Sequence, residues 1–262
     1  MGAWWNLIKK EYRMTRNAYL IFLFLLLAGG LWLVYLSHRY QVGLIIAPTA
    51  MLLTFLVFYP AVYMLRSLAW ESKVTPHLWL HCPQPAWMLL SAKLAISLVQ
   101  MLVIIAMAAG LLLWGILIGT VPEGLPLTNL SSMLSFIMEI GFYSAVFIFA
   151  ASIYIAAWAT FISVVSATAK NILGRFRWLA GIAGILLATW GMGNLQQSLI
   201  FDQITRWGPL NIRLQNLPEI LQGVGMHAHL GYVYTGQIVF YLVLTLALYF
   251  LSTWLIEHKV EV

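Results

Sequence analysis

Long uninterrupted apolar runs restrict what this chain can fold into more than any other feature. A helix needs about twenty residues to cross a hydrocarbon core roughly 30 Å thick, and six runs reach that length. They lie near residues 18–36, 43–65, 89–118, 136–165, 178–197 and 233–256. Because the runs are continuously apolar rather than alternating, they predict membrane-spanning helices, which satisfy their own backbone hydrogen bonds in lipid. The third and fourth runs exceed one bilayer thickness, which calls for tilt, a break or a turn into water.

Composition indicates the same class of protein. Hydrophobic residues make up 62% of the chain and charged residues only 8%, which is too little polar surface to coat a soluble globule of 262 residues. We therefore expect an all-α polytopic membrane protein that forms a single transmembrane domain over residues 1–262. The single cysteine, Cys82, excludes an intrachain disulfide framework. Although the net charge is +6, the cations stand at the ends of apolar runs, so we expect no nucleic-acid partner.

The distribution of Lys and Arg predicts the orientation. One side of the predicted topology carries eleven of the fourteen cations: Lys9, Lys10, Arg13, Arg16, Arg66, Lys73, Lys93, Lys170, Arg175, Arg177 and Lys259. Arg39, Arg206 and Arg213 fall on the other side. Since positive loops stay in the cytoplasm, both termini are expected on the cytoplasmic side of the membrane. The first apolar run is too long for the core of a cleavable signal peptide, so it is expected to remain as an anchor.

Residues 1–17 have the pattern of an interfacial amphipathic helix. Trp4 and Trp5 suit the aromatic belt at the membrane surface. Lys9, Lys10 and Arg13 suit anionic headgroups, at roughly 1 kcal/mol each near the surface. We expect this helix to lie along the inner leaflet, either as a topology anchor alone or with a mechanical role.

A compact polar segment, residues 66–88, separates the second and third apolar runs. Glu71 and Lys73 are placed to begin a short helix, and the prolines at 83 and 85 force an extended link into the next span. Leu78 and Trp79 give this helix an apolar knob for a partner's groove, with the two charges at its rim. The segment is either a docking surface for a soluble partner or a solvated loop whose aromatic rings rest on headgroups.

These residues carry a resemblance to a known family. The arrangement Glu71-x-Lys73-x-Thr75, Leu78-Trp79, Pro83-x-Pro85, Leu89-Leu90 and Lys93, between spans two and three, resembles the permease subunits of bacterial ATP-binding-cassette exporters of the second type. The basic helix before the first span and the plan of six spans are also similar to that family.

The resemblance implies how such a chain is driven. It implies that residues 71–80 form a coupling helix on a separate ATPase subunit, with Glu71, Lys73, Thr75, Leu78 and Trp79 as coupling residues. Two copies of that ATPase would bind ATP and Mg, and a second copy of this chain or a related permease would complete the pathway. The ATPase activity is expected in that separate subunit, since this chain has no Gly-x-x-x-x-Gly-Lys-Ser/Thr phosphate loop, and the chain itself is expected to be no enzyme and to bind no cofactor. The resemblance also implies a bacterial cytoplasmic membrane as the location.

Other segments leave alternatives open. The second cytoplasmic loop, around 170–177, is short and basic and is expected to serve topology. The outer segment 198–232 is either a lid over an exit or an interfacial loop. Glu139, inside the fourth apolar run, and Gln100 are candidates for a substrate pathway. His77, His81 and Cys82 lie close in sequence but lack a clear further metal ligand.

The leading hypothesis is therefore a permease that moves an amphipathic or hydrophobic substrate, such as a peptide, an antibiotic or a lipid-like compound, out of the cell. A membrane sensor or immunity protein that sequesters a peptide is the first alternative. An intramembrane enzyme is the second, although Glu139 is the only acidic residue well inside a predicted span.

Overall fold

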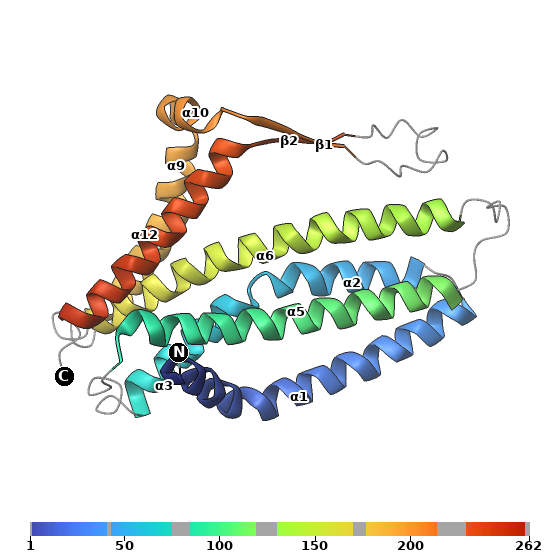
Figure 1. The fold of residues 1–262 in the computed structure, drawn as a ribbon, viewed down its shortest axis with the longest axis horizontal. Coiled ribbons are helices and arrows are strands. Elements are labelled where there is room, and N and C mark those ends of the chain that lie inside the picture. The colour runs from blue at the N-terminus through green and yellow to red at the C-terminus, as the bar shows by residue number, and fades with distance from the viewer. Residues whose placement is uncertain are drawn as a thin grey trace.

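The computed structural model describes residues 2–40, 43–74, 84–118, 130–169, 177–213 and 229–259, which form long helices and one small sheet (Figure 1). The long helices of the first two thirds are α1 (Gly2–Arg39), α2 (Gly43–Leu56), α3 (Tyr59–Val74), α5 (Ala86–Ile118) and α6 (Leu130–Thr168). They are followed by α8 (Arg177–Leu186), the π-helical turn η3 (Leu187–Gly191), α9 (Met192–Gln196), α10 (Leu199–Thr205), strands β1 (Pro209–Arg213) and β2 (His229–Tyr234), and α12 (Thr235–Lys259).

Four single helices are long and apolar enough to cross a membrane: Gly2–Arg39, Ala86–Ile118, Leu134–Thr168 and Thr235–His258. Two further helices, Ile45–Leu56 and Tyr59–Glu71, pass the same test only together and are bent by 42°, which fits either a broken fifth span or a re-entrant loop. The predicted span 178–197 coincides with α8, η3 and α9, none of which reaches eighteen residues alone. The all-α membrane class is confirmed, whereas the count of six spans stays a prediction.

A proline explains the break between α2 and α3. Pro60 lies four residues after Leu56, the last residue of α2. A proline ring clashes with the carbonyl four residues earlier and removes a hydrogen bond, so a helix cannot continue through it unchanged. The predicted span over residues 43–65 took no account of this proline.

The helix predicted over residues 1–17 is continuous with the first predicted span, because α1 runs without interruption from Gly2 to Arg39. Its first part nevertheless turns away from the remainder in Figure 1. The Thr15 hydroxyl donates to the carbonyl of Glu11 at 3.0 Å. Such back-bonding to the preceding turn bends helices, which accounts for a change of direction without a loop.

Small residues bring α1, α2 and α5 close together. A Cβ atom added at Gly115 of α5 would lie 2.6 Å from Cδ1 of Ile45 and 3.6 Å from a methyl of Val34. Gly30 of α1 similarly faces the side chain of Leu111. Helices in membranes associate through such close approaches, since lipid provides no hydrophobic drive between them.

Two short strands of the outer segment were not predicted. β1 pairs with β2 in antiparallel register, with Leu210 opposite Val233. Gly208, at φ +64°, makes the turn that leads from α10 into β1, and its carbonyl accepts hydrogen bonds from Thr235. Residues 214–228 of the outer segment 198–232 lie outside the described ranges, so the choice between a lid and an interfacial loop stays open.

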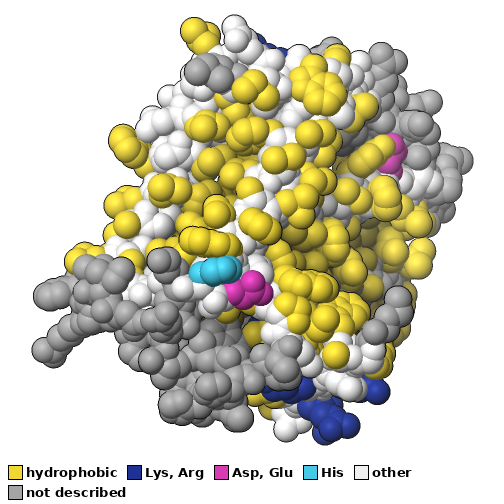
Figure 2. Space-filling model, turned by 60° about the vertical axis from the view of Figure 1, so that its left-hand side comes forward, with side chains coloured by type: hydrophobic (Ala, Val, Ile, Leu, Met, Phe, Trp, Pro, Cys, Tyr) yellow, Lys and Arg dark blue, Asp and Glu magenta, His cyan; other side chains and the backbone are white. Residues whose placement is uncertain are grey.

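The surface fits a membrane protein. Figure 2 shows hydrophobic side chains over most of one face, with Lys and Arg side chains near its lower and upper margins. Figure 1 shows the start of α1, the end of α3, the start of α5 and the end of α12 at one end of the molecule. This end carries the residues that form the candidate site.

Candidate functional site

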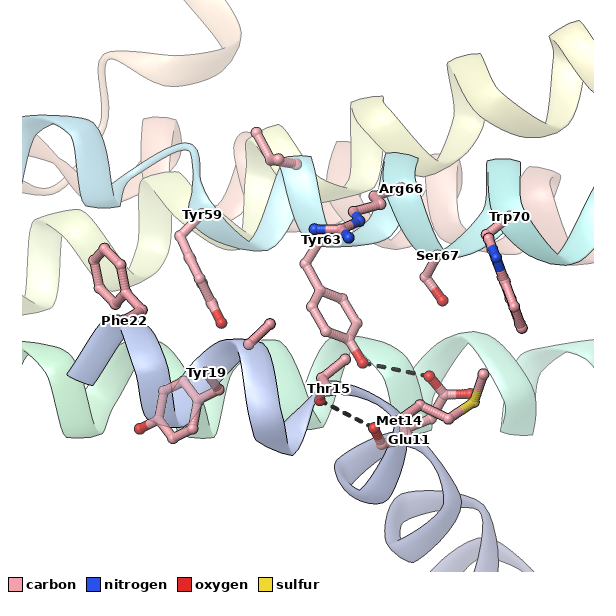
Figure 3. A pocket seen from close by; sticks show the side chains of 12 residues that line it. Glu11, Met14, Thr15, Tyr19, Phe22, Tyr59, Tyr63, Arg66, Ser67 and Trp70 are labelled. Carbon is pink, nitrogen blue, oxygen red and sulfur yellow. Dashed lines mark hydrogen bonds between the residues drawn. The ribbon is translucent and has the colours of Figure 1, made fainter. Parts of the chain in front are cut away.

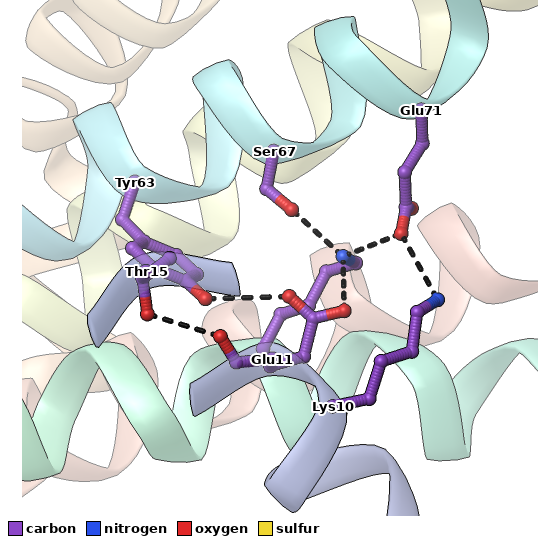
Figure 4. A network of polar contacts seen from close by, with 7 residues as sticks. Lys10, Glu11, Thr15, Tyr63, Ser67 and Glu71 are labelled. Atoms are coloured by element: carbon purple, nitrogen blue, oxygen red, sulfur yellow. Dashed lines mark hydrogen bonds and ion pairs between the residues drawn. The ribbon is translucent and has the colours of Figure 1, made fainter. Parts of the chain in front are cut away.

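A fully buried lysine lies at the centre of the site. Lys93, in the second turn of α5, is 0% exposed, and its Nζ donates to Glu11 Oε1 at 2.8 Å, Glu71 Oε1 at 2.9 Å and Ser67 Oγ at 2.7 Å (Figure 4). An ammonium group has three donors, so all three are used. The lysine therefore connects α5 to both α1 and α3.

Two further groups, Tyr63 and Lys10, complete what we call the Lys93 cluster: Lys93, Glu11, Glu71, Ser67, Tyr63 and Lys10. The Tyr63 hydroxyl donates to Glu11 Oε2 at 3.3 Å. Lys10 Nζ, at the rim with its side chain 53% exposed, lies 3.8 Å from Glu71 Oε1. Two carboxylates and two ammonium groups thus balance in formal charge, which reduces the cost of burying them.

Helical spacing brings these groups to one place. Tyr63, Ser67 and Glu71 are four residues apart along α3, so they share one face of that helix. Glu11 is buried on the opposing face of α1, with only 3% of the residue exposed. Glu71 Oε2 has no hydrogen-bond partner in the parts of the chain that the structure describes.

A pocket of about 450 Å³ adjoins the cluster between α1 and α3 (Figure 3). Two stripes of residues with the same helical spacing line it. The stripe on α1 consists of Glu11, Met14, Thr15, Ala18, Tyr19 and Phe22. The stripe on α3 consists of Tyr59, Val62, Tyr63, Arg66, Ser67 and Trp70.

Gln100 of α5, a pathway candidate from the sequence, joins helices beside this pocket. Its Oε1 accepts from the Tyr59 hydroxyl at 2.8 Å, and its Nε2 donates to Thr15 Oγ1 at 3.2 Å. Its backbone carbonyl accepts from the Tyr19 hydroxyl at 3.4 Å. Gln100 is only 3% exposed, so its amide holds pocket-lining side chains in place. The other pathway candidate, Glu139, is partly buried near the start of α6.

The coupling residues predicted from the sequence are placed differently from the expectation. Glu71 was expected to begin a solvated helix as a rim charge, but it lies in the last turns of α3 and is 3% exposed. The first part of the predicted loop 66–88 is helical through Val74, and α5 already begins at Ala86. Lys73 belongs to α3, whereas Thr75, Leu78 and Trp79 lie outside the described residues, as do His77, His81 and Cys82.

The start of α1 packs on α5 as well as facing outward. The indole of Trp4 donates to Ser91 Oγ at 3.1 Å, and Leu7 packs against Leu89 and Ala92. The remaining residues predicted for the membrane surface are exposed: Trp5, Lys9, Lys10 and Arg13. Part of the apolar face at the start of α1 therefore packs against α5. The sequence-based prediction had assigned this face to the membrane surface.

Sequence reasoning missed the Lys93 cluster. It used Lys93 for the orientation and for the family resemblance, and it did not pair Lys93 with Glu11 of the amino-terminal amphipathic stretch. A signal was present, because Lys93 follows Leu89 and Leu90 within an apolar run, where an isolated charge needs a partner. In the described ranges, no group of three or more His, Cys, Asp or Glu residues is arranged to hold a metal ion.

Comparisons with protein families, with curated proteins and with solved structures found no match to this chain.

Proposed function

We propose that this chain is the permease subunit of an ATP-driven exporter of the second type, which moves an amphipathic or hydrophobic substrate out of a bacterial cell. The observation that carries the proposal is the Lys93 cluster. It joins the end of α3 and the start of α5, the two helices that flank the predicted coupling residues, to α1.

The cluster is suited to transmit force. Glu71 stands four residues before Thr75, and Lys93 lies in the second turn of α5, so a displacement of the intervening segment acts on both partners of one ion pair. Removing one partner of a buried pair costs about 3–5 kcal/mol. The three helices therefore move together more easily than they separate, and Glu11 carries the displacement into α1.

The remaining parts follow from the resemblance. Two copies of a separate ATPase would supply the energy, and a second copy of this chain or a related permease would complete the pathway. Both termini, at one end of the bundle, would face the cytoplasm. The chain itself would perform no covalent chemistry.

Affinity purification of the tagged chain from native membranes tests the proposal. We expect an ATPase subunit to co-purify in stoichiometric amount, and Trp79→Ala to reduce both its retention and the substrate stimulation of ATP hydrolysis. Trp87→Ala is the matched control, because Trp87 is 51% exposed at the start of α5 but lies outside the predicted knob.

Purification of a solitary chain that binds peptide would favour the sensor or immunity alternative and overturn the proposal. Equal ATPase retention in both tryptophan variants would remove the coupling role of residues 71–80.

A further inference from the structure

The pocket lies between α1 and α3, where the side chains that line the two helices do not fill the space between them. The positions on α1 and α3 repeat with the same spacing, so their side chains face each other, yet about 450 Å³ remains between them. That volume is within the range of small-molecule sites. Left empty, such a space forfeits the dispersion contacts that close packing provides.

The lining changes character along the pocket. At one end, Phe22 and Tyr19 of α1 stand opposite Tyr59 of α3 (Figure 3). At the other end are Arg66 and Trp70, both exposed, beside the polar Lys93 cluster. An aromatic and apolar end next to a cationic, interfacial end fits an amphipathic ligand.

Arg66 supplies charge that the protein itself leaves unused. No hydrogen bond or ion pair joins its side chain to any residue in the ranges that the structure describes. Among the described residues that line the pocket, Glu11 is the one carboxylate, and it already binds Lys93 and Tyr63. Because the formal charges of the Lys93 cluster balance, Arg66 is the unmatched charge at the pocket, and a guanidinium group binds phosphate in a bidentate geometry.

We propose that this pocket binds one anionic phospholipid, with its phosphate on Arg66 and an acyl chain lying along Tyr19 and Phe22. A lipid rather than a soluble anion is the occupant, because α1 and α3 belong to candidate membrane spans and the pocket extends along their apolar stripes. The inference concerns the chain alone and does not depend on an ATPase partner.

The test uses the purified full chain in a mild detergent. Phosphatidylglycerol, phosphatidylcholine or inorganic phosphate is added, and binding is followed by native mass spectrometry and by the midpoint of thermal unfolding. We expect phosphatidylglycerol to bind and stabilise the wild type. Arg66→Gln should weaken this binding about tenfold, because a charge-assisted bidentate contact is lost.

Two controls separate the charge from the pocket. Arg16→Gln removes an equivalent charge from an exposed position of α1 that does not line the pocket, and should bind like the wild type. Ala18→Phe fills the space between the stripes and should reduce lipid retention although Arg66 is intact. Arg66→Lys keeps the charge but loses the bidentate geometry, so it should bind phosphatidylglycerol with intermediate affinity. This variant tests the role of Arg66 if Arg66→Gln fails to fold.

The proposal is overturned if the variants at Arg66 and Arg16 bind phosphatidylglycerol equally, or if Ala18→Phe retains it like the wild type. Stabilisation by inorganic phosphate that equals that by phosphatidylglycerol would assign the site to a soluble anion instead. Equal binding of phosphatidylcholine would show that the headgroup charge is not recognised.

Discussion

Two helix contacts in this molecule are held together by different means. Where α1, α3 and α5 meet, a buried ammonium bridges two carboxylates from different helices. Where α6 meets α12, Ala157 and Trp158 pack against Leu248, and the Thr160 hydroxyl donates to Ala156 of its own helix at 2.7 Å.

The difference concerns how each contact tolerates change. A buried ion pair fixes one register, because any displacement leaves a charge without its partner in a medium that solvates it poorly. Packed small residues and hydroxyl groups bonded to their own helix lose stability gradually, since each contributes little. We therefore expect substitutions at the ionic contact to lower the free energy of unfolding more than substitutions at the packed contact, and the expected losses decrease from Lys93→Met to Thr160→Val.

Lys93→Met should have the largest effect. It leaves Glu11 buried without a counter-ion and Glu71 with only the exposed Lys10 3.8 Å away, and we expect a loss of about 3–5 kcal/mol in the free energy of unfolding. Thermal unfolding of the protein in detergent measures it. Lys10→Met is the control, because that ammonium is largely solvated and should contribute little. Equal midpoints for the two variants would contradict an ionic contact at this position.

Glu71→Gln should have a smaller effect, because Lys93 keeps one carboxylate. We expect a loss of about 1.5–3 kcal/mol, the usual range for a hydrogen bond to a charged group. The triple variant Lys93→Met, Glu11→Gln and Glu71→Gln should be more stable than Lys93→Met alone, since no unpaired charge remains. A triple variant less stable than the single one would mean that packing, not charge, governs this contact.

Ala157→Leu probes the packed contact. Ala157 is 4% exposed against Leu248, and the larger side chain should cost about 1–3 kcal/mol through overpacking. Ala150→Leu on the exposed face of α6 should change stability by less than about 0.5 kcal/mol. Similar destabilisation by both would argue that this face of α6 is not closely packed.

Thr160→Val should have the smallest effect. Side-chain hydrogen bonds between membrane helices contribute on average about 0.6 kcal/mol, and we expect no more from this hydroxyl, which bonds to the backbone of its own helix. Chemical denaturation in detergent can resolve a change of this size against the wild type. A loss comparable to that of Lys93→Met would erase the distinction between the two contacts.

Much of the helical framework follows from sequence because each membrane helix satisfies its own backbone. The predicted run 89–118 corresponds to α5, and 136–165 lies within α6. The cluster could not be derived in the same way, since Lys93 and Glu11 are 82 positions apart and meet only through packing. The hydropathy of the sequence shows that a charged residue interrupts an apolar run, but it does not show which distant residue pairs with that charge. The break before Pro60 was readable from the local rule for proline, unlike the β1–β2 pairing, which joins distant segments.

The contact between α1 and α5 has a mechanical consequence. Near one end Trp4 is bonded to Ser91, and at the other Ser37 donates to the carbonyl of Gly115 while His38 lies 2.9 Å from the carbonyl oxygen of Ile118. Because these parallel helices are pinned at both extremities, neither can slide along the other without breaking an attachment. Of the neighbouring segments, the break at residues 57–58 between α2 and α3, already bent by 42°, is then where we expect a change of angle to meet the least resistance.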